Sequence, residues 1–223
     1  MPKVKMPRSV PSLDMTPLVD LAFLLVTFFI LTSSFRQPEP VTVDPPTSVT
    51  PDQIPKQVFL ITIDEKGRAF IDITNQAVKG KVFKDMCKQF KINISDMDSA
   101  KFVGSSSIGL KMGEILGYLD LEPSQRTKVE MSGIPYDTLG MKNTQLYWWA
   151  YYARLAAKND YETRKDEAEK RKLPFDPTSA IKFAVKADSK TKYDVVKNVI
   201  QIFRDVKIKN FEMITGLEDA PAR

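Results

Sequence analysis

The amino-acid sequence predicts a single N-terminal transmembrane helix followed by an α+β domain, a sheet with helices on one face that carries a mostly helical insertion. Three observations predict this fold class: one apolar run near the N-terminus, a proline-rich stretch after it, and alternating strand-like and helix-like patterns in the remainder. The chain has 223 residues, of which 43% are apolar and 27% charged. This composition is typical of a folded domain with attachments rather than of a disordered chain.

The apolar run TPLVDLAFLLVTFFILTSSF occupies residues 16–35 and predicts the transmembrane helix. From Leu18 to Phe35 about eighteen residues contain no charge but Asp20, and at about 1.5 Å per residue they span nearly the hydrocarbon thickness. A cleaved signal peptide is the alternative, but its apolar core is usually shorter, at about 7 to 15 residues. The length and the acid favour an uncleaved anchor in the lipid bilayer.

The charges beside the run predict its orientation. Lys3, Lys5 and Arg8 precede it, whereas only Arg36 follows closely. Because basic residues flank the cytoplasmic end of a span, residues 1–15 are expected in the cytoplasm and everything after the run outside it.

Asp20 is the feature of the run that needs explanation. An ionised Asp near the middle of a bilayer costs about 2.5 to 3.5 kcal/mol, so such residues usually face a partner or water. Thr16, Asp20, Thr27 and Ser34 are spaced by four, seven and seven residues, which places them on one helical face. A polar face of this kind predicts packing inside a helix bundle. The alternative is that Asp20 reaches water at the cytoplasmic surface.

The surroundings predicted for Asp20 also suggest a chemical role. Desolvation raises a carboxyl pKa and hydrogen bonds to the anion lower it, so a balance of the two allows proton exchange near neutral pH. A proton moved through such a site is driven by about 2.3 kcal/mol per charge per 100 mV of membrane potential. One helix makes no channel, so a multi-span partner is implied.

Residues 36–56 predict an extended linker. The segment QPEPVTVDPPTSVTPDQIPK contains six prolines and no long apolar run. The domain is expected to begin at residue 57.

Residues 57–223 alternate between strand and helix patterns. QVFLITIDEKGRAFIDI predicts a hairpin that turns at Asp64 to Gly67, and the next segment repeats apolar residues every four positions, as a helix does. These residues are Val78, Val82, Met86 and Phe90. Near the C-terminus, AIKFAVKAD and IKNFEMIT predict strands on either side of a second helix. The apolar face expected for that helix consists of Tyr193, Val196, Ile200 and Phe203.

The insertion is expected at about residues 95–178. Its main element is a long helix opened by an Asn or Thr cap, with an aromatic face followed by a solvated, charged half. The aromatic face consists of Trp148, Tyr151, Tyr152 and Leu155, and the pattern leaves open whether it is core or a partner site.

The segment LDMTPLVDLAFLLVTFFILTSSF resembles the N-terminal signature of the ExbD/TolR biopolymer-transport proteins, with the match on Thr16, Pro17, Leu18, Val19 and Asp20. The resemblance implies that Asp20 is the protonatable residue of a proton-driven motor. It further implies that two such helices, from a homodimer, stand inside a pentamer of a multi-span ExbB/TolQ-like partner in the bacterial inner membrane.

The resemblance also extends to the domain. It implies a small periplasmic domain in which a strand ending in Ala187 and Asp188 precedes a helix containing Tyr193. The Asn-Leu-Pro motif that often follows the helix in the family is replaced here by Val43 to Pro46, a departure from the pattern.

The leading function is a motor subunit that couples proton motive force to outer-membrane transport through a TonB-like periplasm-spanning protein. The alternatives are a TolR-like subunit for envelope integrity, a gliding-type motor subunit, and a membrane-tethered periplasmic binding module with no proton role. The chain has no His, one Cys and no enzyme motif, so no enzyme, cofactor or metal site is predicted. A net charge of +5 without a basic stripe gives little support to nucleic-acid binding.

Overall fold

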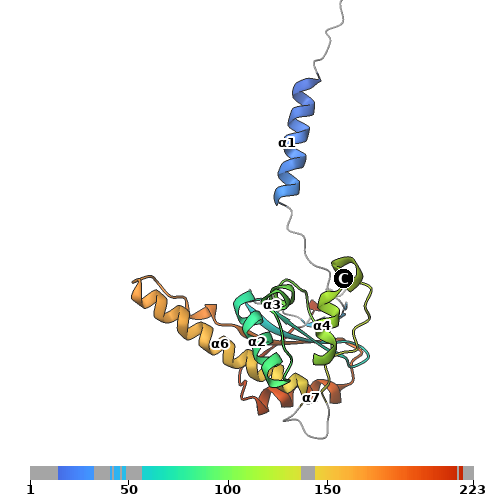
Figure 1. Cartoon of the computed structure of the whole chain (residues 1–223), viewed down its shortest axis with the longest axis vertical. Helices are drawn as coiled ribbons and strands as arrows, with labels where there is room; N and C mark the ends of the chain where they lie inside the picture. The colour runs from blue at the N-terminus through green and yellow to red at the C-terminus, as the bar shows by residue number, and fades with distance from the viewer. Residues whose placement is uncertain are drawn as a thin grey trace, which may run out of the picture. The chain divides into compact units, whose positions relative to one another are not determined.

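A computed structural model describes residues 15–32, 41, 43–45, 47–48, 57–136, 144–214 and 216–217. The chain divides into two compact units, residues 1–37 and residues 38–223. Figure 1 shows the elements of each unit, which are described separately below.

The first unit contains one helix, α1, from Thr16 to Thr32. Pro17 lies in its first turn, where a residue without an N–H donor removes no helical hydrogen bond. No side chain of α1 is buried. Among the residues that the structure describes, no helix is both long enough and apolar enough to cross a membrane. Residues 33–35 of the predicted span lie outside the described residues.

The second unit is built on a four-stranded mixed sheet. Its strands are β2 (Val58–Ile63), β3 (Ala69–Ile73), β4 (Lys182–Ala187) and β5 (Glu212–Ile214), in the order β3-β2-β4-β5. β2 pairs antiparallel with β3 and parallel with β4, which pairs parallel with β5. The predicted hairpin is confirmed: Gly67, with φ of 78°, supplies the left-handed residue of its turn.

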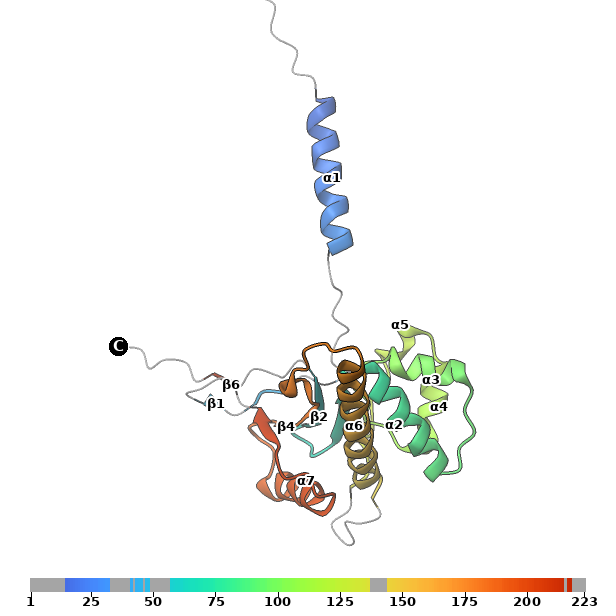
Figure 2. The same ribbon diagram turned by 90° about the vertical axis from the view of Figure 1, so that its left-hand side faces the viewer.

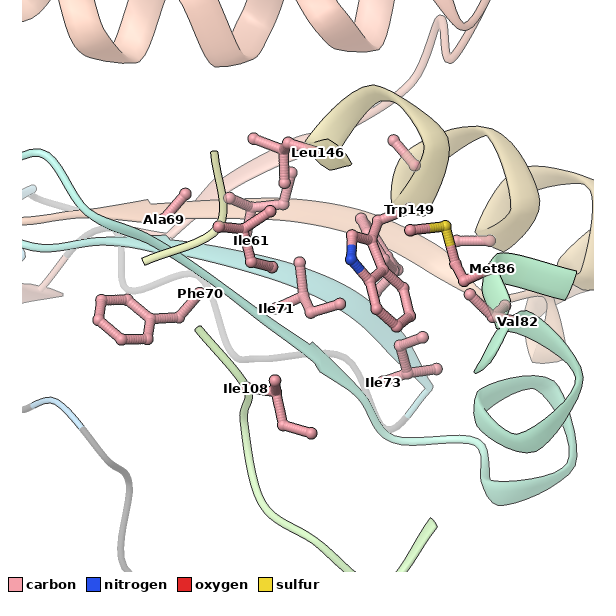
Figure 3. Close-up of a cluster of buried hydrophobic side chains, with 14 of the residues drawn as sticks. Ile61, Ala69, Phe70, Ile71, Ile73, Val82, Met86, Ile108, Leu146 and Trp149 are labelled. Atoms are coloured by element: carbon pink, nitrogen blue, oxygen red, sulfur yellow. The ribbon is translucent and has the colours of Figure 1, made fainter. Parts of the chain in front are cut away.

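Three helices pack with one face of the sheet: α2 (Gln76–Gln89), α6 (Gln145–Lys170) and α7 (Tyr193–Asp205). Figure 2 shows them beside β2 and β4. The core they share with the sheet includes Phe59, Ile61 and Trp149, each 0% exposed, and Figure 3 shows Trp149 beside Met86 of α2. The opposite face has a smaller buried cluster of Val58, Leu60, Ala184 and Ile214.

The helical segment between α2 and β4 extends the sheet at its β3 edge. It contains α3 (Asp96–Val103), α4 (Met112–Asp120), α5 (Pro123–Arg126), α6 and the short 3-10 helix η2 (Pro177–Ser179). Ile108 exchanges two backbone hydrogen bonds with Ile71, and the Ile134 N–H donates to the Ala69 carbonyl. The insertion is therefore part of the sheet's pairing and core rather than a separate appendage.

A second, two-residue pairing joins the linker to the C-terminal end. β1 (Thr47–Ser48) pairs parallel with β6 (Gly216–Leu217). The prediction of an extended linker over residues 36–56 lies mostly outside the described residues, but this short pairing falls within it.

Two predicted helix faces differ from the structure. On α6 the buried residues are Leu146, Trp149, Ala150, Ala153, Ala156 and Ala157, whereas Tyr151 and Leu155 of the predicted aromatic face are exposed. Trp148 and Tyr152 are half-buried. On α7 the buried residues are Val196, Val199, Ile202 and Phe203, and Tyr193 is 74% exposed. The predicted α2 face is confirmed for Val78, Val82 and Met86, and Phe90 is half-buried at the helix end.

Candidate functional site

Asp20 lies in the second turn of α1 and is exposed. A shallow groove on the helix surface includes Asp20 together with Thr16, Pro17 and Phe23. At 100° per residue, Thr16, Asp20 and Thr27 fall within an arc of about 40°, so the structure brings these predicted residues to one face. Ser34, the last residue predicted for this face, lies outside the described residues.

The hydroxyl groups of α1 donate to the helix itself. Thr27 Oγ1 donates to the carbonyls of Phe23 (3.0 Å) and Leu24 (2.9 Å). Thr32 Oγ1, on another side of the helix, donates to the Phe28 carbonyl at 2.8 Å. Since such bonds satisfy the hydroxyl donor within one helix, Thr27 reaches a partner only through its acceptor lone pairs.

A second group of predicted residues meets where the linker contacts the domain. The Asp188 carboxylate accepts hydrogen bonds from the backbone N–H of Asp44 (3.1 Å) and of Lys190 (2.9 Å). The Ser189 N–H donates to the Asp44 carbonyl at 2.8 Å, and neighbouring Val43 is 5% exposed. These bonds to the anion hold the pKa of Asp188 below its usual range. The segment that replaces the family's linker motif is thus attached to the end of β4.

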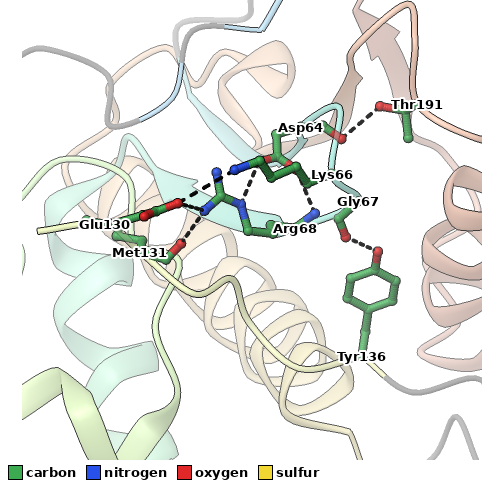
Figure 4. Close-up of polar contacts among 8 residues, drawn as sticks. All are labelled: Asp64, Lys66, Gly67, Arg68, Glu130, Met131, Tyr136 and Thr191. Carbon is green, nitrogen blue, oxygen red and sulfur yellow. Dashed lines mark hydrogen bonds and ion pairs between the residues drawn. The ribbon is translucent and has the colours of Figure 1, made fainter.

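A polar cluster at the β2–β3 turn was not predicted from the sequence (Figure 4). Arg68 donates through Nε to the buried Asp64 carboxylate at 2.7 Å and through Nη1 to Glu130 at 3.0 Å. Arg68 Nη1 also donates to the Met131 carbonyl at 3.0 Å. The hydrogen bond with Asp64 is the main reason that the pKa of Arg68 is raised. The one local signal was an Asp and an Arg four residues apart across the predicted turn.

This cluster also connects to the loop after β4. Thr191 Oγ1 donates to the Asp64 carbonyl at 2.9 Å, and Tyr136 OH donates to the Gly67 carbonyl. The Asp188 N–H donates to the Ile63 carbonyl at 3.0 Å. A continuous set of hydrogen bonds therefore runs from the linker at Asp44, through residues 188–191, to the β2–β3 turn and the insertion.

Two other features bear on chemistry. Within the described ranges, no group of three or more Asp, Glu, Cys or His side chains is arranged to hold a metal ion. Cys87 is buried in α2, and burial raises the pKa of its thiol to about 11. A thiol held in this form is a weak nucleophile at neutral pH.

Comparison with protein families tests the resemblance described above. Residues 6–112 match the family described as biopolymer transport protein ExbD/TolR. Over these residues the chain is similar to the ExbD/TolR family. The matched part contains Asp20, α1, the β2–β3 hairpin, α2 and α3. A comparison with curated proteins and with solved structures found no match.

The family match agrees with the architecture of the sheet domain. The mixed sheet with helices fits an ExbD-type α+β domain, and the family is one of biopolymer transport, whose members work with ExbB/TolQ-type partners. β4, α7 and β5 lie beyond the matched residues. The Ala187, Asp188 and Tyr193 pattern is therefore supported by the sequence resemblance alone.

Proposed function

We propose that this chain is the proton-carrying subunit of an inner-membrane motor of the ExbB-ExbD type. The observation that carries the proposal is Asp20, the single ionisable residue among the 17 residues of α1, within the region that matches the family. Protonation neutralises a carboxylate, and the neutral form is much cheaper in apolar surroundings than the anion. A group of this kind can therefore change its preferred surroundings each time it gains or loses a proton.

The membrane span predicted for residues 16–35 belongs to this proposal. α1 covers 17 residues, about 25 Å at 1.5 Å per residue, against a hydrocarbon core of about 30 Å. Large apolar side chains are exposed along the helix, from Leu18 to Leu31. Exposed apolar surface of this extent needs lipid or protein to cover it.

The proposal also includes the partner proteins and the compartment in which each part of the chain lies. Residues 1–15 lie in the cytoplasm, the domain lies in the periplasm, and two copies of α1 stand inside an ExbB/TolQ-like pentamer that provides the path for the proton. The domain passes the resulting movement to a TonB-like protein that energises outer-membrane transport. The support is the family's biopolymer-transport description and the implied need of a single helix for a multi-span partner.

Asp20→Asn tests the proposal, because Asn keeps the size of the side chain and cannot ionise. We expect the variant to co-purify with the multi-span partner but to lose proton-dependent transport in cells. Asp20→Glu is the matched control, since it restores an ionisable carboxyl and should retain part of the activity. Full transport by the Asn variant would contradict the motor and favour the tethered binding module.

A further inference from the structure

A row of exposed lysines follows one face of α2. Lys81, Lys84 and Lys88 are three and four residues apart, so their side chains lie on the same side of the helix. They border a groove between α2 and α3 whose lining also includes Asp85, Gly80 and Ser99. The feature belongs to the domain and contains no residue of α1.

Gly80 and Ser99 line this groove where the two helices meet. A Cβ at Gly80 would lie 3.2 Å from Val103 Cγ2 and 3.9 Å from Ser99 Oγ, so the two helices approach closely at this point. Ser99 is 7% exposed as a residue and lines the groove, where its hydroxyl can donate a hydrogen bond to a ligand.

The charge of the lining is positive. Three lysines and one aspartate give a net charge of +2. Lys84 pairs with Asp96 at 3.1 Å and Lys88 with Asp85 at 3.7 Å, whereas Lys81 makes no ion pair with any residue that the structure describes. Asp96 is 98% exposed, and exposed pairs of this kind contribute at most about 1 kcal/mol. Carboxylates of a ligand can therefore replace these partners.

We propose that the groove between α2 and α3 binds an acidic, extended segment of a partner polypeptide. Lys84 and Lys88 are separated by about 6 Å along the helix axis. Side chains on one side of an extended chain repeat every 6.6 to 6.8 Å, roughly the same spacing. Acidic residues at alternate positions of such a segment would face the lysine row, and the Ser99 hydroxyl would donate to one of its carbonyls or carboxylates.

The acids beside the lysines favour a polypeptide over a bilayer. A flat anionic membrane would meet the exposed carboxylate of Asp96 together with the lysines. A peptide chain can lie along the groove and offer its carboxylates singly. The expected ligand is therefore a polypeptide segment with separate acidic side chains at regular spacing.

Fluorescence anisotropy with the full chain in detergent micelles tests this proposal. The probe is a labelled peptide of about ten residues that alternates Glu and Ser, so that successive Glu side chains match the lysine spacing. We expect saturable binding that Lys81→Glu weakens about tenfold or more, because an opposed charge replaces an attractive one. Ser99→Ala should weaken it about threefold, as expected for one neutral hydrogen bond.

Lys197→Glu is the matched control, because Lys197 is exposed on α7 and the change in net charge is the same. It should alter peptide affinity by less than about twofold. Equal losses for Lys81→Glu and Lys197→Glu would show unspecific attraction and overturn the proposal. It would be overturned equally by a lack of saturable peptide binding, or by binding to anionic phospholipid vesicles that the peptide does not compete away.

Discussion

The helix α1 and the sheet domain use their polar groups in opposite ways. In α1 no side chain is buried, and the one carboxylate stands among exposed apolar residues. In the domain, the buried carboxylate of Asp64 is bound by the backbone and side chain of Arg68, which also reaches the insertion. The domain pairs its buried Asp64 carboxylate internally, whereas the carboxylate of α1 is exposed.

This difference predicts two classes of variant. Substitutions inside the domain should lower the free energy of unfolding, because its groups depend on one another. Substitutions on the polar face of α1 should change function while the stability of the domain stays constant. Unfolding can be followed by the fluorescence of Trp149, which is fully buried in the core.

Gly109→Ala should have the largest effect on stability. A Cβ at Gly109 would overlap the ring of buried Phe70, and the Gly109 N–H donates to Met131 Sδ at 3.2 Å, so neither neighbour can move freely. We expect a loss of about 3 kcal/mol in the free energy of unfolding, measured by urea denaturation.

Gly117→Ala is the matched control for that variant. Gly117 lies in α4 with open space around its Cβ position, so Ala should stabilise the helix by about 0.5 to 1 kcal/mol. If both variants changed stability equally, the close packing of the insertion against β3 would be wrong.

Arg68→Met should have the next largest effect. Met keeps much of the apolar stem but removes the guanidinium, which leaves the Asp64 carboxylate, 7% exposed, without its charged partner. We expect a loss of about 2 kcal/mol in the free energy of unfolding. Lys66→Met controls for the removal of charge, because Lys66 is 71% exposed and pairs with Glu130 only at 3.7 Å. A comparable loss for Lys66→Met would show that the cluster contributes through general electrostatics.

The elements of the fold were largely predictable, but the buried faces of two helices were not. The first half of α6 has apolar residues on two sides, and periodicity cannot choose between them. The structure buries the side with Ala153, Ala156 and Ala157, whose small side chains allow α2 and α6 to approach closely. The larger aromatic residues had suggested that the other side of α6 is buried. The close packing of α2 and α6 instead favours the side with the small residues.

In the candidate site, too, local patterns were predictable from the sequence and long-range contacts were not. Asp20 and its neighbours were found because their spacing is local and repeats within one helix. Arg68 and Glu130 are 62 residues apart, and Asp44 and Asp188 are 144 residues apart, so no sequence period brings either pair together. The single-residue bridges of Ile108 and Ile134 to β3 likewise have no strand pattern around them.

The contact between Asp44 and Asp188 predicts a dependence on pH. The pKa of Asp188 in the folded chain is lower than in the unfolded chain, so the unfolded state binds more protons in acid. Its contribution to stability is complete above about pH 4 and is lost as pH falls through the folded-state pKa. We expect the protection of the Asp44 amide against hydrogen exchange, taken relative to the intrinsic rate at each pH, to fall over the same range.

Asp188→Asn tests this contact at constant pH. The neutral amide accepts hydrogen bonds more weakly than the anion, so the Asp44 amide should exchange faster than in the natural chain even near neutral pH. Asp194→Asn, at an exposed position in the first turn of α7, should leave that amide unchanged. Unchanged exchange in Asp188→Asn would place the attachment of the linker on Val43 and the backbone alone.

Thr27→Val should have the smallest effect, and it bears most directly on the polar face of α1. Thr27 and Thr32 both donate to carbonyls four residues earlier, so replacing either with Val removes the same internal bond. Any difference between the two variants then reports on what lies outside the helix. Thr27 shares the face of Asp20 and Thr32 does not, so we expect proton-dependent transport to fall about threefold in Thr27→Val and to stay nearly constant in Thr32→Val. Equal effects would mean that Asp20 acts without the hydroxyl beside it, and that the face consists of the carboxylate alone.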